Sequence, residues 1–448
     1  MSTTTVPTLT AGVREIAAAV ARGDTTPDEQ LELVLARIAA TEDRLQAWSR
    51  LEIDVARQQA EELTAEAKAG KLRGVLHGVP VAVKDEFYVT GMPTQARGPG
   101  AAPEAEDATV VARLREAGAI VVGKTHMPVN GVNPPTRNPW NLAHTPGGSS
   151  SGSGAAVGAR IVPFGVAEQT GGSALRPGAY CGVSAVKPSY GRISRFGCFP
   201  FSWSKDTVGF IGLDLEDLAL VLSAVCGYDP KDPTSLHLPA PEADLKLSTV
   251  KPPRIGIVRN FFPEKQEDYM NEAIDAAGRK LADAGATVED FLLPDDFELV
   301  EHSMRLVGAE AAAMNAAMGL DRVSSGSQRN GVELIPATYF VQARRIRTML
   351  ISKLASIFDT YDGLIMATAP GHAPEGLHTT GDASLLQPWT FLGYPEVNLN
   401  AGLSPAGLPL GIQLVGGPRK DYEIMQTGAW SEKVLGLLPP PPLVAGWS

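Results

Sequence analysis

Two turns rich in glycine and serine, within residues 145–191, constrain the fold more than any other part of the sequence. The first covers residues 147–154 and reads Gly-Gly-Ser-Ser-Ser-Gly-Ser-Gly, and the second ends at Ser173 and reads Gln-Thr-Gly-Gly-Ser. Glycine is needed where the chain bends sharply or where a ligand approaches the backbone amides. Most runs of this composition are flexible linkers, but small apolar residues follow the first turn at once, which indicates a buried helix and strand.

Bare backbone N–H groups of this kind serve two different chemistries. A phosphate-binding loop would carry Gly-Lys followed by Ser or Thr where this chain has Gly152-Ser153, which weakens that interpretation. A hydroxyl beside free amides suits a nucleophile with an oxyanion hole. The spacing of the two turns alone leaves the choice open.

A third stretch, residues 76–85, decides between these chemistries. It reads Leu-His-Gly-Val-Pro-Val-Ala-Val-Lys-Asp, a short apolar strand that ends at Lys84. Together with the two turns it resembles the amidase signature family of serine hydrolases. The resemblance extends from about residue 12 to residue 435, and residues 138–141, Asn-Pro-Trp-Asn, match the same pattern. It implies an α/β fold in which a central mixed sheet is flanked by helices on both faces.

The resemblance also assigns roles to three side chains. Ser173 is expected to be the nucleophile, Ser149 the bridging serine that follows a cis peptide bond, and Lys84 the base. Burial disfavours the charged form of a lysine, so we expect a lowered pKa and a neutral amine at Lys84. The oxyanion hole is expected at the backbone N–H groups of Ser173 and of Thr170, Gly171 and Gly172. The mechanism requires no metal and no organic cofactor.

Three further residues are predicted to contact the substrate. Gly131 lies in a loop that lines the pocket in relatives, and it follows the small polar Asn130. Gln169 replaces the aspartate found in many members. Arg176 lies three residues after the nucleophile, where malonamidase-like relatives hold a substrate carboxylate. The alternative for Arg176 is an ion pair with a nearby acid such as Glu168, which would leave the pocket to neutral substrates.

The predicted function is hydrolysis of C–N bonds in neutral amides or carbamates (urethanes), through an acyl-enzyme. Gln169 and its neighbours Ala167 and Glu168 depart from the pattern of the tRNA-linked glutamine amidotransferase subunit, which favours an amidase that acts alone. Two alternatives stay open: the amidase subunit of a glutamine amidotransferase complex, and a malonamidase-like amidase for substrates that bear a carboxylate. The intact Lys84, Ser149 and Ser173 make a non-catalytic scaffold an unfavoured interpretation.

The 448 residues are predicted to form one domain with three parts. Residues 1–228 carry Lys84 and the turns, residues 229–360 form a crossover and a variable helical region, and residues 361–448 close the core. Apolar periodicity predicts helices at 26–38, 55–68, 108–117, 215–225, 269–284, 310–318, 335–357 and 421–434. Strands are predicted at 79–83, 120–123, 254–258, 287–291 and 363–370. Aromatic residues at 196–203 are expected to pack in the core or to face an apolar substrate.

The composition narrows the set of partners. A net charge of −11 argues against nucleic acid and against an anionic membrane. The chain has three cysteines, no stretch long enough to cross a membrane and no signal-peptide pattern, so we expect a cytoplasmic protein with reduced thiols. The scattered histidines, His372 and His378 included, show no metal-ligand spacing. We therefore expect a monomer or homodimer that binds a small amide or carbamate.

Overall fold

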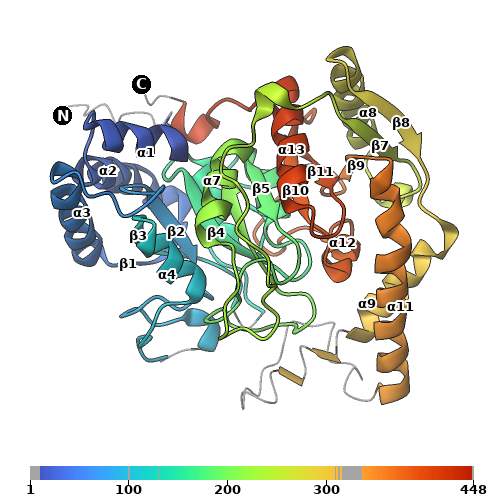
Figure 1. Ribbon diagram of the computed structural model, residues 1–448, viewed down its shortest axis with the longest axis horizontal. Coiled ribbons are helices and arrows are strands. Elements are labelled where there is room, and N and C mark those ends of the chain that lie inside the picture. The colour runs from blue at the N-terminus through green and yellow to red at the C-terminus, as the bar shows by residue number, and fades with distance from the viewer. Residues whose placement is uncertain are drawn as a thin grey trace.

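The computed structural model describes residues 11–98, 101–129, 131–307, 309–310, 313–314 and 335–445. Within these ranges one 11-stranded sheet runs through the molecule, in the order β1-β3-β2-β4-β6-β5-β10-β11-β9-β7-β8 (Figure 1). Its strands are β1 Trp48–Leu51, β2 Pro80–Lys84, β3 Ile120–Thr125, β4 Phe164–Gln169, β5 Ser184–Lys187, β6 Thr207–Gly212, β7 Arg254–Val258, β8 Thr287–Phe291, β9 Gly363–Ala367, β10 Glu396–Leu403 and β11 Pro409–Val415.

The sheet is mixed, as predicted. β2 runs parallel to both β3 and β4, and β7 runs parallel to both β8 and β9. The strands between these two groups, from β6 to β11, pair antiparallel with their neighbours. The predicted crossover region therefore contributes β7 and β8 to one edge of the same sheet.

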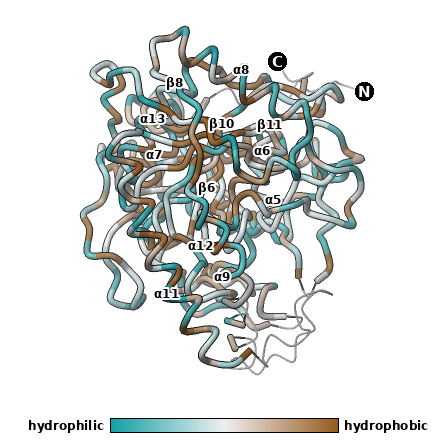
Figure 2. The backbone as a smooth tube through the Cα atoms, turned by 90° about the vertical axis from the view of Figure 1, so that its right-hand side faces the viewer, coloured by the Kyte–Doolittle hydropathy of each residue, from teal (hydrophilic) through white to brown (hydrophobic). Residues whose placement is uncertain are grey.

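Helices cover both faces of the sheet, because its central strands are apolar on both sides. In β2, Val81 and Val83 belong to one core cluster and Ala82 to a second one on the opposite face. The first cluster packs against α1 Val13–Arg22, α4 Thr109–Glu116, α7 Leu215–Val225, α8 Asp268–Asp283 and α13 Asp421–Leu435. The second packs against α2 Pro27–Leu45, α3 Ile53–Lys68, α5 Ser151–Gly158 and α6 Leu175–Cys181. In Figure 2 the segments near β10 and β11 are largely hydrophobic.

Local sequence signals explain where several elements begin. The capping box predicted before the helix at 26–38 is present, since the Thr26 hydroxyl accepts from the Glu29 N–H and the Glu29 carboxylate accepts from the Thr26 N–H. The helix is longer than predicted and continues to Leu45. The strand predicted at 79–83 is β2, and every residue of β2 is buried.

The variable region contains the helix predicted at 335–357, which is α11 Ala337–Ala355 and is two residues shorter at each end. Three helices lie together beside the sheet: α9 Leu299–Val307, α11 and α12 Gln387–Leu392. Most of the helix predicted at 310–318 lies outside the described residues.

The aromatic residues at 196–203 do not form the expected core cluster. Phe201 and Trp203 are exposed, and the Arg195 guanidinium lies over the Trp203 ring.

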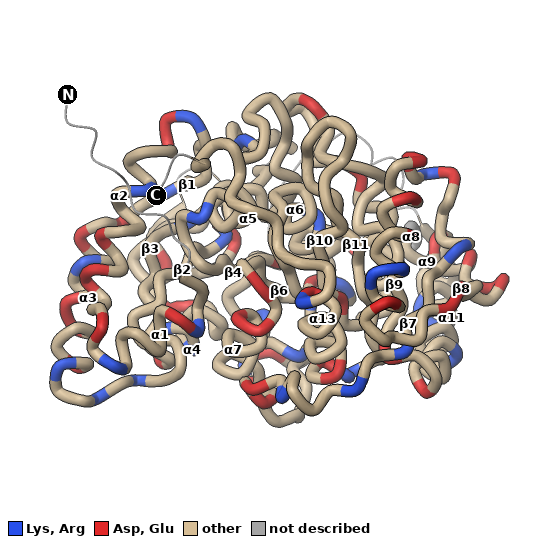
Figure 3. Tube along the Cα trace, turned by 90° about the horizontal axis from the view of Figure 1, so that it is seen from above, with Lys and Arg blue, Asp and Glu red and all other residues tan. Residues whose placement is uncertain are grey.

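Charged residues gather on the peripheral elements, such as α3 and the segments around β7 and β8, whereas α5 and α6 are mainly uncharged (Figure 3). Cys181, Cys198 and Cys226 are buried and free, in agreement with the expected reduced thiols. In the part of the chain that the structure describes, no helix combines the length and the hydrophobicity that a membrane span requires.

Candidate active site

β2 carries Lys84 into the middle of the molecule. The strand lies between β3 and β4, and the Lys84 side chain is completely buried at its carboxyl end. The Lys84 Nζ donates a hydrogen bond of 2.8 Å to the Ser149 Oγ. The structure therefore brings together the two side chains that the sequence predicts as base and bridge, although they lie 65 positions apart.

The first glycine-serine turn holds Ser149 beside the second turn. The peptide bond between Gly148 and Ser149 is cis, as the family resemblance implies. Gly147 has a φ of +85°, and a Cβ added there would lie 3.1 Å from the Pro177 Cα, so glycine is required at this position. The Ser150 N–H donates to the Ser173 carbonyl oxygen at 3.2 Å, and this bond joins the two turns directly.

The second turn connects β4 to α6 and leaves its backbone amides unpaired within the described structure. None of the hydrogen bonds among the described residues uses the backbone N–H groups of residues 170–173. Unpartnered N–H groups at a turn can stabilise an oxyanion. Glycine fits closely at position 172, because a Cβ there would lie 2.7 Å from the Leu386 Cδ1 and the Leu386 side chain would have to shift. The Ser173 hydroxyl makes no hydrogen bond in the described structure, and the expected contact with Ser149 is not formed in this arrangement.

Two glutamates stand beside Lys84 and correct the expectation for its charge. The Glu86 Oε1 lies 2.7 Å from the Lys84 Nζ, and the Glu168 Oε2 lies 3.4 Å from it. Burial by itself lowers the pKa of Lys84, but the two carboxylates outweigh burial and raise that pKa above its usual value. The prediction of a lowered pKa is therefore wrong, because it considered desolvation without these neighbours.

A threonine links Glu168 to a further buried acid, Asp206. The Thr170 Oγ1 lies 2.8 Å from the Glu168 Oε1 and 2.7 Å from the Asp206 Oδ1. Burial, reinforced by the charge of Glu86, raises the pKa of Glu168 to about 7. Burial and the charge of Glu168 raise the pKa of Asp206 to about 7. Neither Glu86 nor Asp206 is among the site residues predicted from the sequence. Glu86 could have been found from its place two residues after Lys84, whereas nothing in the local sequence marks Asp206.

Gln169 takes a structural role among the described residues, and its contact with substrate stays a prediction. Its side chain is fully buried, and its Oε1 accepts from the N–H groups of Ala174 and Leu175 at 3.1 and 3.0 Å. Its Nε2 donates to the Thr390 Oγ1 at 2.9 Å and lies 3.4 Å from the Glu396 Oε2. Both ends of the amide are engaged within the protein, so Gln169 fixes the start of α6 directly after Ser173.

Arg176 pairs with carbonyl oxygens, and the predicted ion pair with Glu168 is absent. Its two terminal nitrogens donate to the carbonyl oxygens of Gly381 and Gly148, and one of them also contacts the Thr380 Oγ1 at 3.2 Å. Burial lowers the pKa of Arg176. The prediction failed because Glu168 faces Lys84 and Thr170 instead. Arg176 thus connects the turn at Ser149 to the segment after β9.

Gly131, the third predicted substrate contact, lies in an exposed turn. Its φ is +79°, and the flanking Val129 and Val132 exchange two backbone hydrogen bonds of 3.0 Å. Asn130 lies outside the described residues. A contact between Gly131 and substrate therefore stays a prediction.

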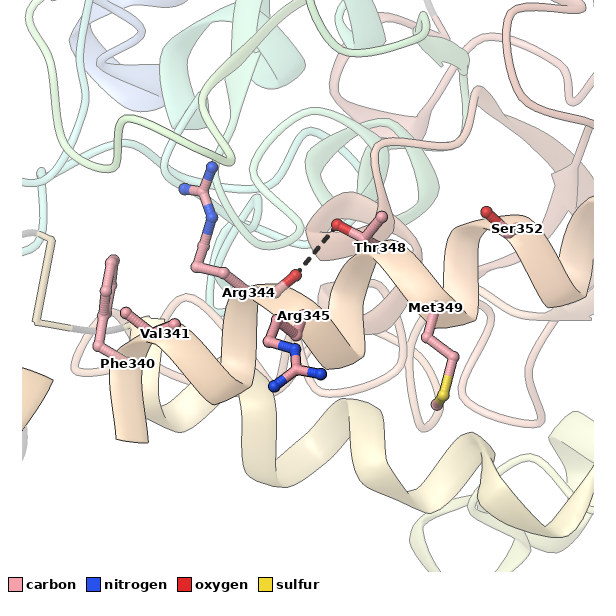
Figure 4. A pocket seen from close by; sticks show the side chains of 7 residues that line it. All are labelled: Phe340, Val341, Arg344, Arg345, Thr348, Met349 and Ser352. Carbon is pink, nitrogen blue, oxygen red and sulfur yellow. Dashed lines mark hydrogen bonds between the residues drawn. The ribbon is translucent and has the colours of Figure 1, made fainter. Parts of the chain in front are cut away.

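An open groove of about 620 Å³ runs along α11, away from these residues. The side chains of Arg345 and Met349 point to the same side of α11 (Figure 4). The groove is lined by seven residues of this helix: Phe340, Val341, Arg344, Arg345, Thr348, Met349 and Ser352. No residue of this groove contacts Lys84, Ser149 or the second turn in the described hydrogen bonds. The described residues also contain no group of three potential metal ligands.

A mixed sheet between two helical layers, with a buried lysine bonded to a serine beside an open glycine-serine turn, defines a hydrolase of the amidase class. The family model named Amidase matches residues 29–425, and the chain belongs to this family of enzymes that hydrolyse C–N bonds.

Known proteins are similar over nearly the whole length. A glutamyl-tRNA(Gln) amidotransferase subunit from Anaeromyxobacter sp. (strain K) is 34% identical over 96% of this chain and 97% of its own length. The native peptide amidase from Stenotrophomonas maltophilia superposes with a TM-score of 0.82 at 27% identity, over 96% of this chain and 98% of that one. A chain from a vestigial protein complex that reveals the evolutionary origins of an s-triazine catabolic enzyme superposes with a TM-score of 0.87 at 27% identity. The match covers 96% of this chain and 100% of that one. These matches agree with the predicted family and fold.

Proposed function

We propose that this amidase hydrolyses neutral amides or carbamates through an acyl-enzyme on Ser173. The observation that carries the proposal is the 2.8 Å bond from the Lys84 Nζ to the Ser149 Oγ, at a turn that is itself bonded to the Ser173 carbonyl. The four free N–H groups of the second turn support the same interpretation, because an acyl transfer needs donors where negative charge develops.

The chemistry begins with attack of the Ser173 Oγ on the carbonyl carbon. Its proton passes to the Ser149 Oγ, while the Ser149 proton passes to a neutral Lys84. The carbonyl oxygen gains the negative charge and accepts hydrogen bonds from the amides of residues 170–173. The proton then returns through Ser149 to the leaving nitrogen as the C–N bond breaks. Water attacks the acyl-enzyme by the reverse proton path and releases Ser173.

The charges around the site favour substrates without a negative charge. Three buried acids, Glu86, Glu168 and Asp206, lie next to Lys84 or to its neighbours. The terminal nitrogens of Arg176 already contact protein carbonyl oxygens. A carboxylate on the substrate would meet this acidic cluster, and both terminal nitrogens of Arg176 are already engaged by the protein.

Replacement of Ser173 by alanine tests the mechanism. The variant should stay folded and lose nearly all turnover of an aryl amide or carbamate, because the attacking oxygen is gone. A serine-directed phosphonate should label the wild-type protein at Ser173 and leave Ser173→Ala unlabelled. Labelling of another serine in the wild-type protein, with Ser173 untouched, would overturn the assignment.

The charge preference is tested with two substrates that differ only in a terminal carboxylate or its methyl ester. We expect a higher kcat/KM for the ester. A clear preference for the acid that disappears in Arg176→Ala would favour the malonamidase-like alternative instead.

The curated relatives support a second candidate function. Several are named as subunits of glutamyl-tRNA(Gln) amidotransferase, at 30–34% identity, and a subunit works within an assembly. The purified single chain separates the two candidates. Turnover of simple amides by this chain alone supports the first, whereas activity that requires additional proteins supports the second.

A further inference from the structure

The acids around Lys84 form an arrangement that the proposed mechanism does not use. An ammonium group has three N–H donors, and the Lys84 Nζ has three oxygen neighbours: the Ser149 Oγ at 2.8 Å, the Glu86 Oε1 at 2.7 Å and the Glu168 Oε2 at 3.4 Å. The side chains of Glu86 and Glu168 are only 7% and 6% exposed, so water screens their charges weakly. These contacts stabilise the charged lysine, whereas the mechanism needs the neutral one.

Thr170 determines how protons are shared between Glu168 and Asp206. Its single hydroxyl hydrogen can be donated to only one of the two carboxyl oxygens that lie 2.7 and 2.8 Å away. The other oxygen must carry a proton of its own to make a favourable contact. The Asp206 Oδ2 accepts from the N–H groups of Phe201 and Ser202, at 2.7 and 2.8 Å, which favours its anionic form. The additional proton therefore belongs on Glu168 in neutral solution.

Burial is the main cause that raises the pKa of Glu168 to about 7, so Glu168 loses this proton as the pH rises past that value. At alkaline pH, where a lysine becomes neutral, Glu168 is then an anion beside the Lys84 Nζ. Burial raises the pKa of Glu86 as well, but the Lys84 charge 2.7 Å away opposes burial and favours a second anion there. Two nearby negative charges oppose the loss of the lysine proton.

Other charged groups near the site do not replace these two acids. Asp85 forms its own pair with Lys124, with 2.8 Å between the Asp85 Oδ1 and the Lys124 Nζ. Burial raises the pKa of Cys198 well above its usual value, so this thiol stays neutral. Burial lowers the pKa of Lys205, which faces Asp206 rather than Lys84.

We propose that Glu86 and Glu168 are positioning residues that hold Lys84 as an ammonium ion in the resting protein, and that these two acids set the pH above which the enzyme turns over. This inference rests on the proposed function. It goes beyond that function because it assigns the midpoint of the acid limb of the pH profile to two specific acids. Glu86 should have the larger effect, because it lies closer to the Lys84 Nζ.

The test is the pH profile of kcat/KM for Glu86→Gln and Glu168→Gln. Glutamine keeps the shape of the side chain and removes its charge. The acid limb should move to lower pH by about 1–3 units in Glu86→Gln, and in the same direction by less in Glu168→Gln. Glu86→Asp, which keeps the charge, should hold the limb close to that of the wild-type protein.

The matched control is Glu432→Gln, in which a buried acid is replaced far from Lys84. Glu432 lies on α13 and contacts the Ser184 hydroxyl and the Leu215 N–H, so its replacement should leave the midpoint of the profile unchanged. Folded Glu86→Gln and Glu168→Gln proteins with unchanged midpoints would overturn the inference. If Glu86→Gln fails to fold, the midpoint of Glu168→Gln decides. Failure of the proposed function is a separate result, because Ser173→Ala would then retain turnover.

Discussion

Lys84 and Lys187 occupy matching places in two regions of the sheet, yet they have different surroundings. Each is the last residue of a short strand, β2 or β5, and each side chain is completely buried. Lys187 contacts the carbonyl oxygens of Pro188 and Tyr394, and its Nζ lies 3.3 Å from the Glu396 Oε1. Lys84 contacts one hydroxyl and two carboxyl groups instead.

The difference shows that partners, rather than burial, decide what a buried lysine can do. Burial lowers the pKa of Lys187, and one carboxylate only partly compensates. Two carboxylates raise the pKa of Lys84 at the same burial. Carbonyl oxygens cannot exchange protons, whereas the Ser149 hydroxyl can pass one on. The surroundings of Lys187 therefore suit a structural cation, and those of Lys84 suit proton transfer.

The largest expected effect follows from removing the amine of Lys84, the lysine with the two carboxyl neighbours. In Lys84→Met, kcat should fall by about 10²–10⁴-fold, the usual loss when a general base is removed. Circular dichroism should show a folded protein, because Glu86 and Glu168 can each take up a proton. Near-normal kcat/KM in a folded variant would contradict the role of Lys84 as base.

The same replacement at Lys187 should act on stability instead. Lys187→Met leaves Glu396 buried without its cation, and burial already raises the pKa of Glu396 to about 7. Above that pH the unpaired carboxylate should cost about 3–5 kcal/mol of unfolding free energy, and below it Glu396 takes up a proton and the cost falls. Urea denaturation measures this cost, and the double variant with Glu396→Gln should recover part of it. Turnover per folded molecule should change little. An unchanged denaturation midpoint would show that the Lys187–Glu396 pair contributes nothing.

The smallest effect concerns a buried acid without a lysine partner. Burial raises the pKa of Glu432 to about 8, so the folded state binds its proton more tightly than the unfolded chain does. The resulting stability is fully present below about pH 4.3 and is lost as the pH rises towards 8. Glu432→Gln lacks this loss. Between pH 5 and 8 the unfolding free energy of Glu432→Gln should therefore increase relative to that of the wild-type protein, by at most about 1.4 kcal/mol per pH unit. If the unfolding free energies of the two proteins changed in parallel with pH, the raised pKa of Glu432 would be contradicted.

The sequence predicts the parts of the site that depend on local pattern. The apolar strand before Lys84 and the capping box at Thr26 follow from short motifs, and the cis bond before Ser149 follows from the family resemblance. The structure contains each of them. The strand at 120–123 and the helix at 55–68 are likewise present, with bounds that differ by two residues.

The charges of the site could not be predicted, because they depend on contacts between distant segments. Arg176 meets the carbonyl of Gly381, 205 positions later, and Thr170 meets Asp206 across the pairing of β4 with β6. The proposed pair of Arg176 with Glu168 relied on nearness in sequence. In the fold, Glu168 reaches β2 instead, since β2 and β4 are neighbours in the sheet.

The support that Gln169 receives from Thr390 and Glu396 has a consequence for synthesis of the protein. Lys84, Ser149 and Ser173 all belong to the first two fifths of the chain, but β10 starts only at Glu396. At about 5–20 residues per second, a ribosome needs roughly 10 to 45 seconds to travel from Ser173 to Glu396. A nascent chain thus carries every proposed reactive group well before the strand that supports Gln169 exists, and we expect hydrolysis to begin only when translation is nearly complete.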